Sequence, residues 1–376
     1  RQSMAKRGGY ILHLDGTSDG GSPHLVSGLD GLSKLVLNNI KVPSEKSEFL
    51  IPFLEGIKQD FGAPLALVHD MGRGIQKAVD QVFPGIPDYI CHFHFLRDIG
   101  KDLLEPDYGM LRTCLKNNKI KSLLRQRASA LRDNIVLDPA AIAELTASLE
   151  SGVIALKTAH RMPALIAFVM IQWILDAHHE SGGYGFPFDR PHLVFCQRLK
   201  IAMTLLEQIK DRHLIEGNLA GSIKAIAPLA RLYDFLAEIL RNKHIHQAVK
   251  ALEERAVVFD ALRAAMRIAL PETEAGLNDE GEDIDMQTIE QGLTEFKAWI
   301  QSENFPFDQS HYTGLLRQLN KYWPKLLATS ITISAPSGKV TVVPQRTNND
   351  MERLFRNIKR GHRKKTGTSQ MSRGLR

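Results

Sequence analysis

The sequence predicts an α/β core that holds a mixed five-stranded sheet and is interrupted by a large all-α insertion. Short apolar, strand-like runs fill residues 10–110, and helical periodicity with few strand signals follows from about 111. Two strand-like runs and a last helix come after residue 329. We therefore expect three segments: 1–110 as the first part of the core, 111–329 as the insertion domain, and 330–376 as the last part of the core with a basic tail.

The first segment contains five strand-like runs. LALVHD is almost continuously apolar, which is typical of a central strand buried on both faces. Helices are expected at Ser47–Phe61, around Ile75–Val82 and after the fifth run. The order of three strands, a helix, a strand, a helix and a strand is that of an RNase H-like fold. The runs are YILHLDGT (10–17), LVSGLDG (25–31), KLVLNNIKV (34–42), LALVHD (65–70) and YICHFHF (89–95).

The second segment consists of amphipathic runs rich in Ala and Leu, which indicates one domain of several helices. The longest apolar stretch, 164–177, is too short to span a membrane and contains Gln172, so we expect a buried helix. Residues 271–285 hold seven acids and no base, which predicts a solvated spacer. TSITIS and KVTVVP, separated by APSG, predict a hairpin that leads to the last helix.

Composition places the chain among globular proteins, since 43% of its 376 residues are hydrophobic and 24% are charged. Three Cys form no disulfide framework, which indicates a reducing, intracellular compartment. We expect the cytoplasm, in association with the nucleoid, in a bacterium and the nucleus in a eukaryote. No membrane association is expected.

Positive charge is concentrated near the C-terminus. Residues 346–376 hold ten Lys and Arg against two acids, a local charge of +8, and since the whole chain carries +6 the remainder carries −2. A second basic stretch, Arg112 to Arg132, has seven Lys and Arg and no acid. Such stretches attract phosphate backbones, although either one could be only a solvated helix face.

The last helix begins in the sequence TNNDMERLFRNIKR, 347–360. Asn348 and Asn349 are good N-cap candidates, and an apolar stripe follows at helical spacing: Met351, Leu354, Phe355 and Ile358. Glu352 then lies in the first turn, where the helix dipole favours a carboxylate. Taken alone, this pattern indicates a capped amphipathic helix with an ordinary Glu352–Arg356 pair.

Two further acids change that interpretation. Asp15 ends the first strand-like run and Asp70 ends the fourth. Acids at two strand ends and on a helix suit a two-metal phosphoryl-transfer site, in which carboxylates hold Mg²⁺ or Mn²⁺. Rival acids are nearby. Asp19 and Asp30 lie in predicted turns, Asp350 is expected to cap the helix, and His69 is expected to be structural.

These features resemble the DDE transposases of the Mutator-like and hAT-like group. Asp15 and Asp70 are 55 residues apart, and another 282 residues separate Asp70 from Glu352, which leaves room for an inserted domain. The group carries a large helical insertion before its last Glu and a C-x-x-H motif after its second Asp, matched here by Cys91 and His94. A basic residue seven positions after the Glu, also common in the group, is matched by Lys359.

The resemblance implies a DNA transposase that cleaves element ends and joins them to target DNA, with Asp15, Asp70 and Glu352 holding two Mg²⁺ (or Mn²⁺) ions. It also implies a homodimer or larger synaptic assembly. Six basic residues of the last helix would follow the DNA backbone: Arg356, Lys359, Arg360, Arg363, Lys364 and Lys365.

Alternatives stay open at this point. The same acids suit an RNase H-like nuclease or resolvase, and a transposase-derived protein could bind DNA without cutting it. Cys91 and His94 could also be zinc ligands, but a structural zinc site needs about four ligands and the other two Cys show no paired spacing. We expect Cys91 and His94 to support the site by packing and hydrogen bonding.

Overall fold

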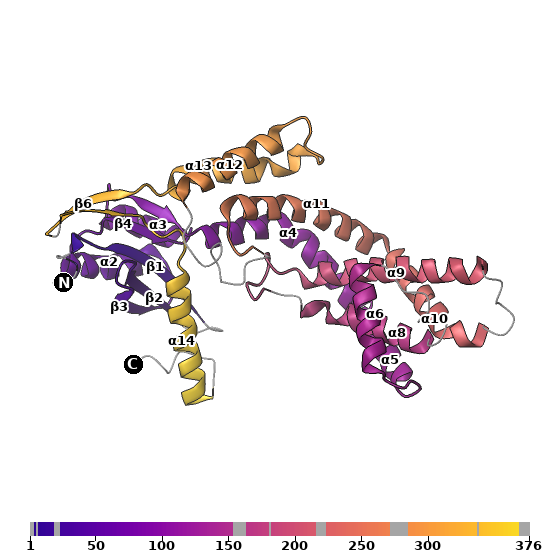
Figure 1. The fold of residues 1–376 in the computed structure, drawn as a ribbon. Helices are drawn as coiled ribbons and strands as arrows, with labels where there is room; N and C mark the ends of the chain where they lie inside the picture. The colour runs from indigo at the N-terminus through magenta and orange to yellow at the C-terminus, as the bar shows by residue number, and fades with distance from the viewer. Residues whose placement is uncertain are drawn as a thin grey trace. The chain divides into compact units, whose positions relative to one another are not determined.

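The computed structural model describes residues 4, 7–18, 23–152, 163–179, 182–215, 223–270, 285–336 and 338–367. Its contacts divide the chain into two compact units. Unit 1 contains Arg1–Ile99 and Asp260–Arg376, and unit 2 contains Gly100–Phe259. Figure 1 shows the sheet of unit 1 and the helices of unit 2. Two helices, α4 (His92–Asn117) and α11 (Lys243–Met266), contribute residues to both units.

Unit 1 is built on the predicted mixed five-stranded sheet, whose strand order is β3-β2-β1-β4-β5. The pairs β1–β2 and β2–β3 are antiparallel, whereas β1–β4 and β4–β5 are parallel. The strands are β1 (Ile11–Thr17), β2 (His24–Asp30), β3 (Leu35–Val42), β4 (Ala66–His69) and β5 (Asp88–Ile90). Because β1 and β4 are parallel neighbours, Asp15 and Asp70 lie toward the same end of the sheet.

Helices α2 (Ser47–Phe61) and α3 (Arg73–Val82) cover one face of the sheet. Leu12 and Leu14 of β1 pack in this core with Leu67 of β4, together with Leu54 and Ile57 of α2. Successive side chains of a strand point to opposite faces. The intervening residues of β1, including His13 and Asp15, therefore face away from α2 and α3.

The opposite face is covered by segments from the end of the chain. A separate hairpin, β6 (Ile331–Ala335) and β7 (Gly338–Val342), contributes Val342 to a cluster with Ile11 and Val68. Helix α14 (Asn349–Thr366) packs its apolar stripe against Leu25 and Leu29 of β2. The predicted hairpin and the predicted apolar face of the last helix are both confirmed.

The prediction of a long fifth strand over YICHFHF was wrong. β5 ends at Ile90, and α4 begins at His92. The Cys91 backbone N–H still donates to the His69 carbonyl of β4, but the His92 N–H donates to the carbonyl of Arg346. This bond to a distant segment turns the chain out of the sheet, and the C-x-x-H motif therefore opens a helix.

The contact-based units also differ from the expected boundaries at 110 and 329. Helices α12 (Met286–Gln301) and α13 (Thr313–Leu326) fall in unit 1 with the sheet. For α13 the reason is packing on β5 and on the start of α4: Lys325 Nζ lies 2.6 Å from Asp88 Oδ2 of β5, and the ring of Tyr322 meets that of Phe95 in α4 edge to face. The acidic residues 271–284 lie outside the described part of the chain.

Among its described residues, unit 2 consists of helices and the segments that connect them and contains no strand, as the periodicity predicts. Helix α8 (Pro163–Leu175) is buried along most of its length, in agreement with its apolar sequence. It packs against α5 (Ile120–Arg132), α6 (Pro139–Ser151), α9 (Pro191–Ile215) and α10 (Ile223–Leu240). Across the described ranges of both units, every helix is too short or too polar to cross a membrane.

Candidate active site

Asp15 is the most buried of the three candidate acids. It lies in the last half of β1, is only 4% exposed, and accepts a hydrogen bond of 2.8 Å from the Gly16 N–H through Oδ1. Burial raises the pKa of Asp15 well above its usual value, and the charges of Asp70 and Glu352 raise it further. The carboxyl of Asp15 therefore lies within electrostatic range of both other acids.

Asp70 directly follows β4, where the chain turns toward α3. Its Oδ1 accepts a 2.9 Å hydrogen bond from the Gly72 N–H, and Gly72 is the residue before the first turn of α3. Burial raises the pKa of Asp70 as well, although this hydrogen bond opposes the shift. The turn holds the carboxylate at the end of the sheet and leaves it half-buried.

Glu352 reaches the site from α14. Its side chain is 29% exposed, and its Oε1 lies 3.9 Å from Nε2 of His94, which is in the first turn of α4. Burial raises the pKa of Glu352, while the positive charges of Arg97 and Arg356 lower it. The structure thus brings together four of the predicted site residues, Asp15, Asp70, Glu352 and His94, from four separate segments.

Asn348 fixes the start of α14 against β1. Its Oδ1 lies 2.9 Å from Nδ1 of His13, its Nδ2 donates to the Leu14 carbonyl at 3.0 Å, and its carbonyl accepts from the Glu352 N–H at 3.0 Å. Asn348 is 1% exposed. It occupies the predicted N-cap position, but its side chain bonds the strand instead of the helix. The amide therefore links the strand of Asp15 to the helix of Glu352.

The hydrogen bonds of Asn348 determine the proton position on His13. A carbonyl accepts only, so the Asn348 amide nitrogen must face Leu14 and its oxygen must face His13. Nδ1 of His13 consequently carries the proton. Burial lowers the pKa of His13 to about 4, which keeps the imidazole neutral at physiological pH.

Cys91 connects the same region to α4. Its Sγ accepts hydrogen bonds from the backbone N–H groups of His94 and Asn348, the latter at 3.3 Å. Burial raises the pKa of the Cys91 thiol to about 12, so the free thiol is protonated at neutral pH and is not a nucleophile. The expected supporting role of Cys91 fits this geometry, in which the sulfur joins the first turns of α4 and α14.

The rival residues have other partners. Asp30 is fully buried and accepts hydrogen bonds from the turn that follows β2. His69 is held by the Asp70 carbonyl and Asp88, as a structural residue would be. Asp350 does not cap α14 as expected, since Lys34 Nζ binds its carboxylate at 2.6 Å. Asp19 lies outside the described residues.

Two charged residues of the site were not predicted. Glu45 precedes α2, acts electrostatically on both Asp15 and Asp70, and binds His24 Nδ1 at 2.9 Å. Arg97 follows His94 by one turn of α4 and acts on Asp70 and Glu352. The helical spacing from His94 could have identified Arg97 if the helix had been predicted to begin at His92.

The acids have the right chemistry for a hard divalent cation but do not enclose one by themselves. Carboxylate oxygens are the ligands of Mg²⁺ and Mn²⁺. Within the ranges that the structure describes, no group of three or more His, Cys, Asp or Glu side chains is arranged so that it could hold a metal ion. Mg²⁺ commonly binds through one or two carboxylates together with waters and substrate phosphates, so the donor set fits such an ion.

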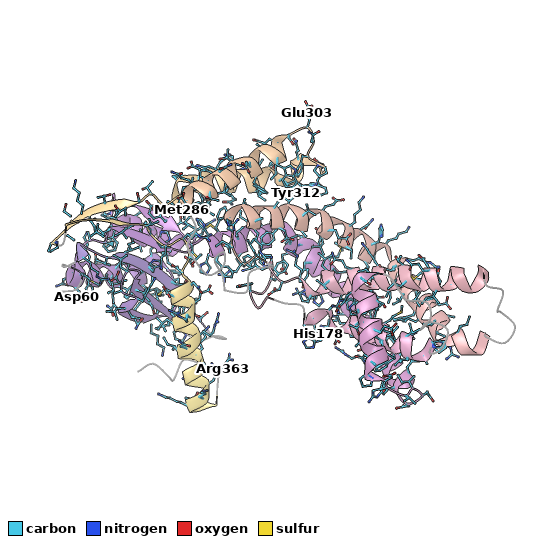
Figure 2. All side chains as sticks on the ribbon, viewed as in Figure 1. Asp60, His178, Met286, Glu303, Tyr312 and Arg363 are labelled. Atoms are coloured by element: carbon cyan, nitrogen blue, oxygen red, sulfur yellow. The ribbon has the colours of Figure 1, made fainter. Side chains whose placement is uncertain are left out.

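Basic residues line the outer side of α14. Of the six predicted DNA-binding residues, Lys359 is half-buried, with its Nζ 3.3 Å from the Ser18 carbonyl. The remaining five are exposed because the apolar stripe of the helix faces β2: Arg356, Arg360, Arg363, Lys364 and Lys365. Figure 2 labels Arg363 on this helix.

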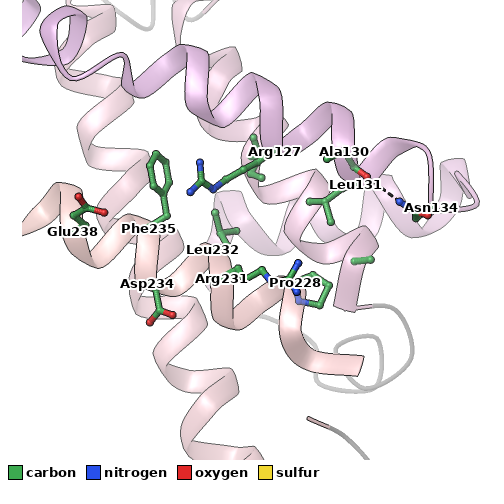
Figure 3. Close-up of a pocket in the computed structure, with 12 residues that line it drawn as sticks. Arg127, Ala130, Leu131, Asn134, Pro228, Arg231, Leu232, Asp234, Phe235 and Glu238 are labelled. Carbon is green, nitrogen blue, oxygen red and sulfur yellow. Dashed lines mark hydrogen bonds between the residues drawn. The ribbon is translucent and has the colours of Figure 1, made fainter. Parts of the chain in front are cut away.

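The second basic stretch lies in unit 2, at the end of α4 and along α5. Some of its charges are already engaged. Arg127 lies over the Phe235 ring at 3.8 Å, in a pocket between α5, α8 and α10 that Figure 3 shows. Arg125 and Arg132 are exposed and line a second pocket, with Asp176 and His178. Neither pocket contains any of the predicted site residues.

Comparison with known proteins adds no assignment. No family model matches the chain, and no curated protein matches it. The function must therefore be inferred from the arrangement of the acids, of His94 and of the basic residues around them.

Proposed function

We propose that the chain is a DNA transposase of the DDE type, built on an RNase H-like core, that cleaves phosphodiester bonds and joins the freed 3′-OH to target DNA. One observation carries this proposal. Asp15, Asp70 and Glu352 come from the inside of one strand, the end of another and a distant helix, yet the charges of Asp70 and Glu352 both act on Asp15. Carboxylates that repel one another in a buried site destabilise the fold, and such arrangements cluster where function requires them.

The proposed reaction needs divalent cations, for which Asp15, Asp70 and Glu352 would be the protein ligands. When bound, Mg²⁺ or Mn²⁺ would lower the pKa of the attacking water and neutralise charge on the leaving oxygen. The chain itself positions the acids: Asn348 couples the strand of Asp15 to the helix of Glu352. No covalent intermediate with the protein is required, since cleavage and joining are both in-line displacements by oxygen.

The basic face of α14 supports a nucleic-acid substrate. Glu352 lies near the start of this helix, and the exposed cations follow from Arg356 onward. If a DNA duplex bound along the basic face of α14, its phosphate backbone would extend toward Glu352 and the other acids. Contacts of this kind are independent of base sequence and weaken as salt increases.

His94 is expected to order the site or contact the scissile phosphate, because its Nε2 lies 3.9 Å from Glu352. His94→Ala should lower the cleavage rate by about 10²-fold, in the range seen for loss of one positioned polar group. The unfolding temperature should change little. The exposed histidine of unit 1, His311, provides the matched control, and its alanine variant should cleave normally. An unaltered rate in His94→Ala would exclude a role for this side chain.

Strand transfer distinguishes the proposal from its alternatives. We expect the protein, incubated with Mg²⁺ and two DNA molecules, to form products in which a 3′-end is covalently joined to the second molecule. Cleavage without any joined product would favour the RNase H-like nuclease or resolvase. DNA binding with neither product would favour a non-catalytic binding protein and would contradict the proposed activity.

A further inference from the structure

Arg97 lies on the part of α4 that faces the candidate active site. It follows His94 by three positions, so the two side chains share one face of the helix. His94 in turn places this face against Glu352, at 3.9 Å between Nε2 and Oε1. Arg97 is only half-buried and can therefore be reached by a ligand that enters the site.

The guanidinium lies near two acids without being neutralised by either. Its charge lowers the pKa of both Asp70 and Glu352, which places it within electrostatic range of each. Among the described residues, nevertheless, Arg97 forms no ion pair with an acid and its Nε, which is buried, has no hydrogen-bond partner. A buried N–H of a charged group without an acceptor costs free energy. An anion that accepted a hydrogen bond from this N–H would remove that cost.

The ring of Phe93, one turn earlier on α4, also contacts the guanidinium, with Cζ of Arg97 5.8 Å from the ring centroid. This contact orients the planar group and leaves its hydrogen-bonding edges for another partner. A guanidinium presents paired N–H donors that match two oxygens of one phosphate, which an ammonium cannot do.

We infer that Arg97 binds the non-bridging oxygens of the phosphodiester that enters the site, and that it offsets the repulsion between that phosphate and the acids. The inference rests on the proposed function, because it assigns a residue to the substrate of the same site. A phosphate that approaches Asp15, Asp70 and Glu352 meets groups that carry charge of its own sign when ionised. Arg97 is the cation that acts on two of these acids, so it is placed to hold the phosphate among them.

The test measures phosphate contact separately from catalysis. Affinity for a short DNA duplex is measured with Ca²⁺ in place of Mg²⁺ over about 50–200 mM salt, where each phosphate contact adds about 0.9 to the slope of log affinity against log salt. Arg97→Ala should reduce this slope by about 0.9. Lys77→Ala, which removes an exposed charge from α3 on the other face of the sheet, should leave it unchanged. Arg97→Lys should keep the slope.

A second measurement uses cleavage with Mg²⁺. Arg97→Ala should cleave about 10²-fold more slowly than the wild type, and added guanidinium ion at millimolar concentration should restore part of the rate. A merely structural loss would not be restored in this way. Arg97→Lys should also cleave slowly, because it keeps the charge but not the paired donors.

The outcomes separate the two proposals. An Arg97→Ala slope equal to that of the wild type overturns the role of Arg97, whether or not the wild type cleaves. If the slope falls but the wild type cuts no DNA, the phosphate contact stands and the transposase activity does not. If Arg97→Ala fails to fold, the test relies on Arg97→Lys. Cleavage by Arg97→Lys at the wild-type rate would overturn recognition of the phosphate through the paired donors.

Discussion

Replacing Asp15 by Asn is expected to abolish cleavage and, at the same time, to make the protein more stable. The carboxyl is 4% exposed, and burial together with Asp70 and Glu352 disfavours its charge. The amide removes that charge and keeps an oxygen for the Gly16 N–H. We expect a gain of about 0.5–2 kcal/mol in the free energy of unfolding. Gains of this size are typical of single stabilising substitutions, and this one removes a buried charge that two other acids repel. The cleavage rate should fall by roughly 10³-fold or more. A carboxylate ligand is lost, and a bound metal stabilises the charge of the transition state by several kcal/mol.

The pH dependence of stability provides the control for this prediction. The folded pKa of Asp15 is raised, so its contribution to stability is fully present below the unfolded pKa and is lost as pH rises through the folded pKa. The stability difference between Asp15→Asn and the wild type, measured in EDTA, should therefore be largest near neutral pH and should shrink in acid. Added Mg²⁺ should raise the unfolding temperature of the wild type more than that of the variant. A variant less stable than the wild type at pH 7 would contradict this account.

Asn348→Ala should be the most damaging substitution outside the acids. It leaves the Nδ1–H of His13 and the Leu14 carbonyl buried without their partner. Each loss costs about 1–3 kcal/mol, so we expect the free energy of unfolding to fall by about 2–4 kcal/mol. The cleavage rate should fall by about 10²-fold even where the protein remains folded, because a displacement of about 1 Å in a catalytic group has that effect.

The adjacent asparagine offers a matched control. Asn349 is exposed, and its alanine variant should stay within about 0.5 kcal/mol of the wild type. Equilibrium unfolding and cleavage would be measured for both variants, with DNA affinity as a check that the basic face of α14 is intact. Equal effects of the two substitutions would show that the Asn348 amide does not couple β1 to α14.

Much of unit 1 could be predicted because its signals are local. Short apolar runs identify β1 and β2, a continuous apolar run identifies β4, and the spacing of Met351 and Phe355 identifies the buried face of α14. Asp70 and Glu352 were found for the same reason, since Asp70 follows β4 directly and Glu352 lies in the first turn of α14. Asp15 was expected to end the first strand, but β1 continues to Thr17 because Gly16 and Thr17 still pair with β2. The mixed sheet and its neighbouring strands follow from that order of elements.

The errors arise where a distant segment decides the outcome. YICHFHF alternates like a strand, but the Arg346 carbonyl takes the His92 N–H and a helix begins there. Helical periodicity locates α13 but does not reveal that Lys325 binds Asp88 of β5. Asn348 has the sequence of an N-cap, yet buried partners on β1 take its side chain. Glu45 belongs to a residue type that is common on surfaces, so only the fold reveals its proximity to the acids. Arg97 was missed because the start of α4 at His92 was not predicted.

The most direct test of the central claim is cleavage of supercoiled plasmid with Mg²⁺ by the wild type and by Glu352→Gln. The variant keeps the size and hydrogen-bonding capacity of the side chain and removes its charge, while the basic face of α14 is unchanged. The account predicts that the wild type cuts, that Glu352→Gln does not, and that both bind DNA with the same dependence on salt. Equal cleavage by the two proteins, or binding without cleavage by either, would contradict a catalytic site formed by Asp15, Asp70 and Glu352.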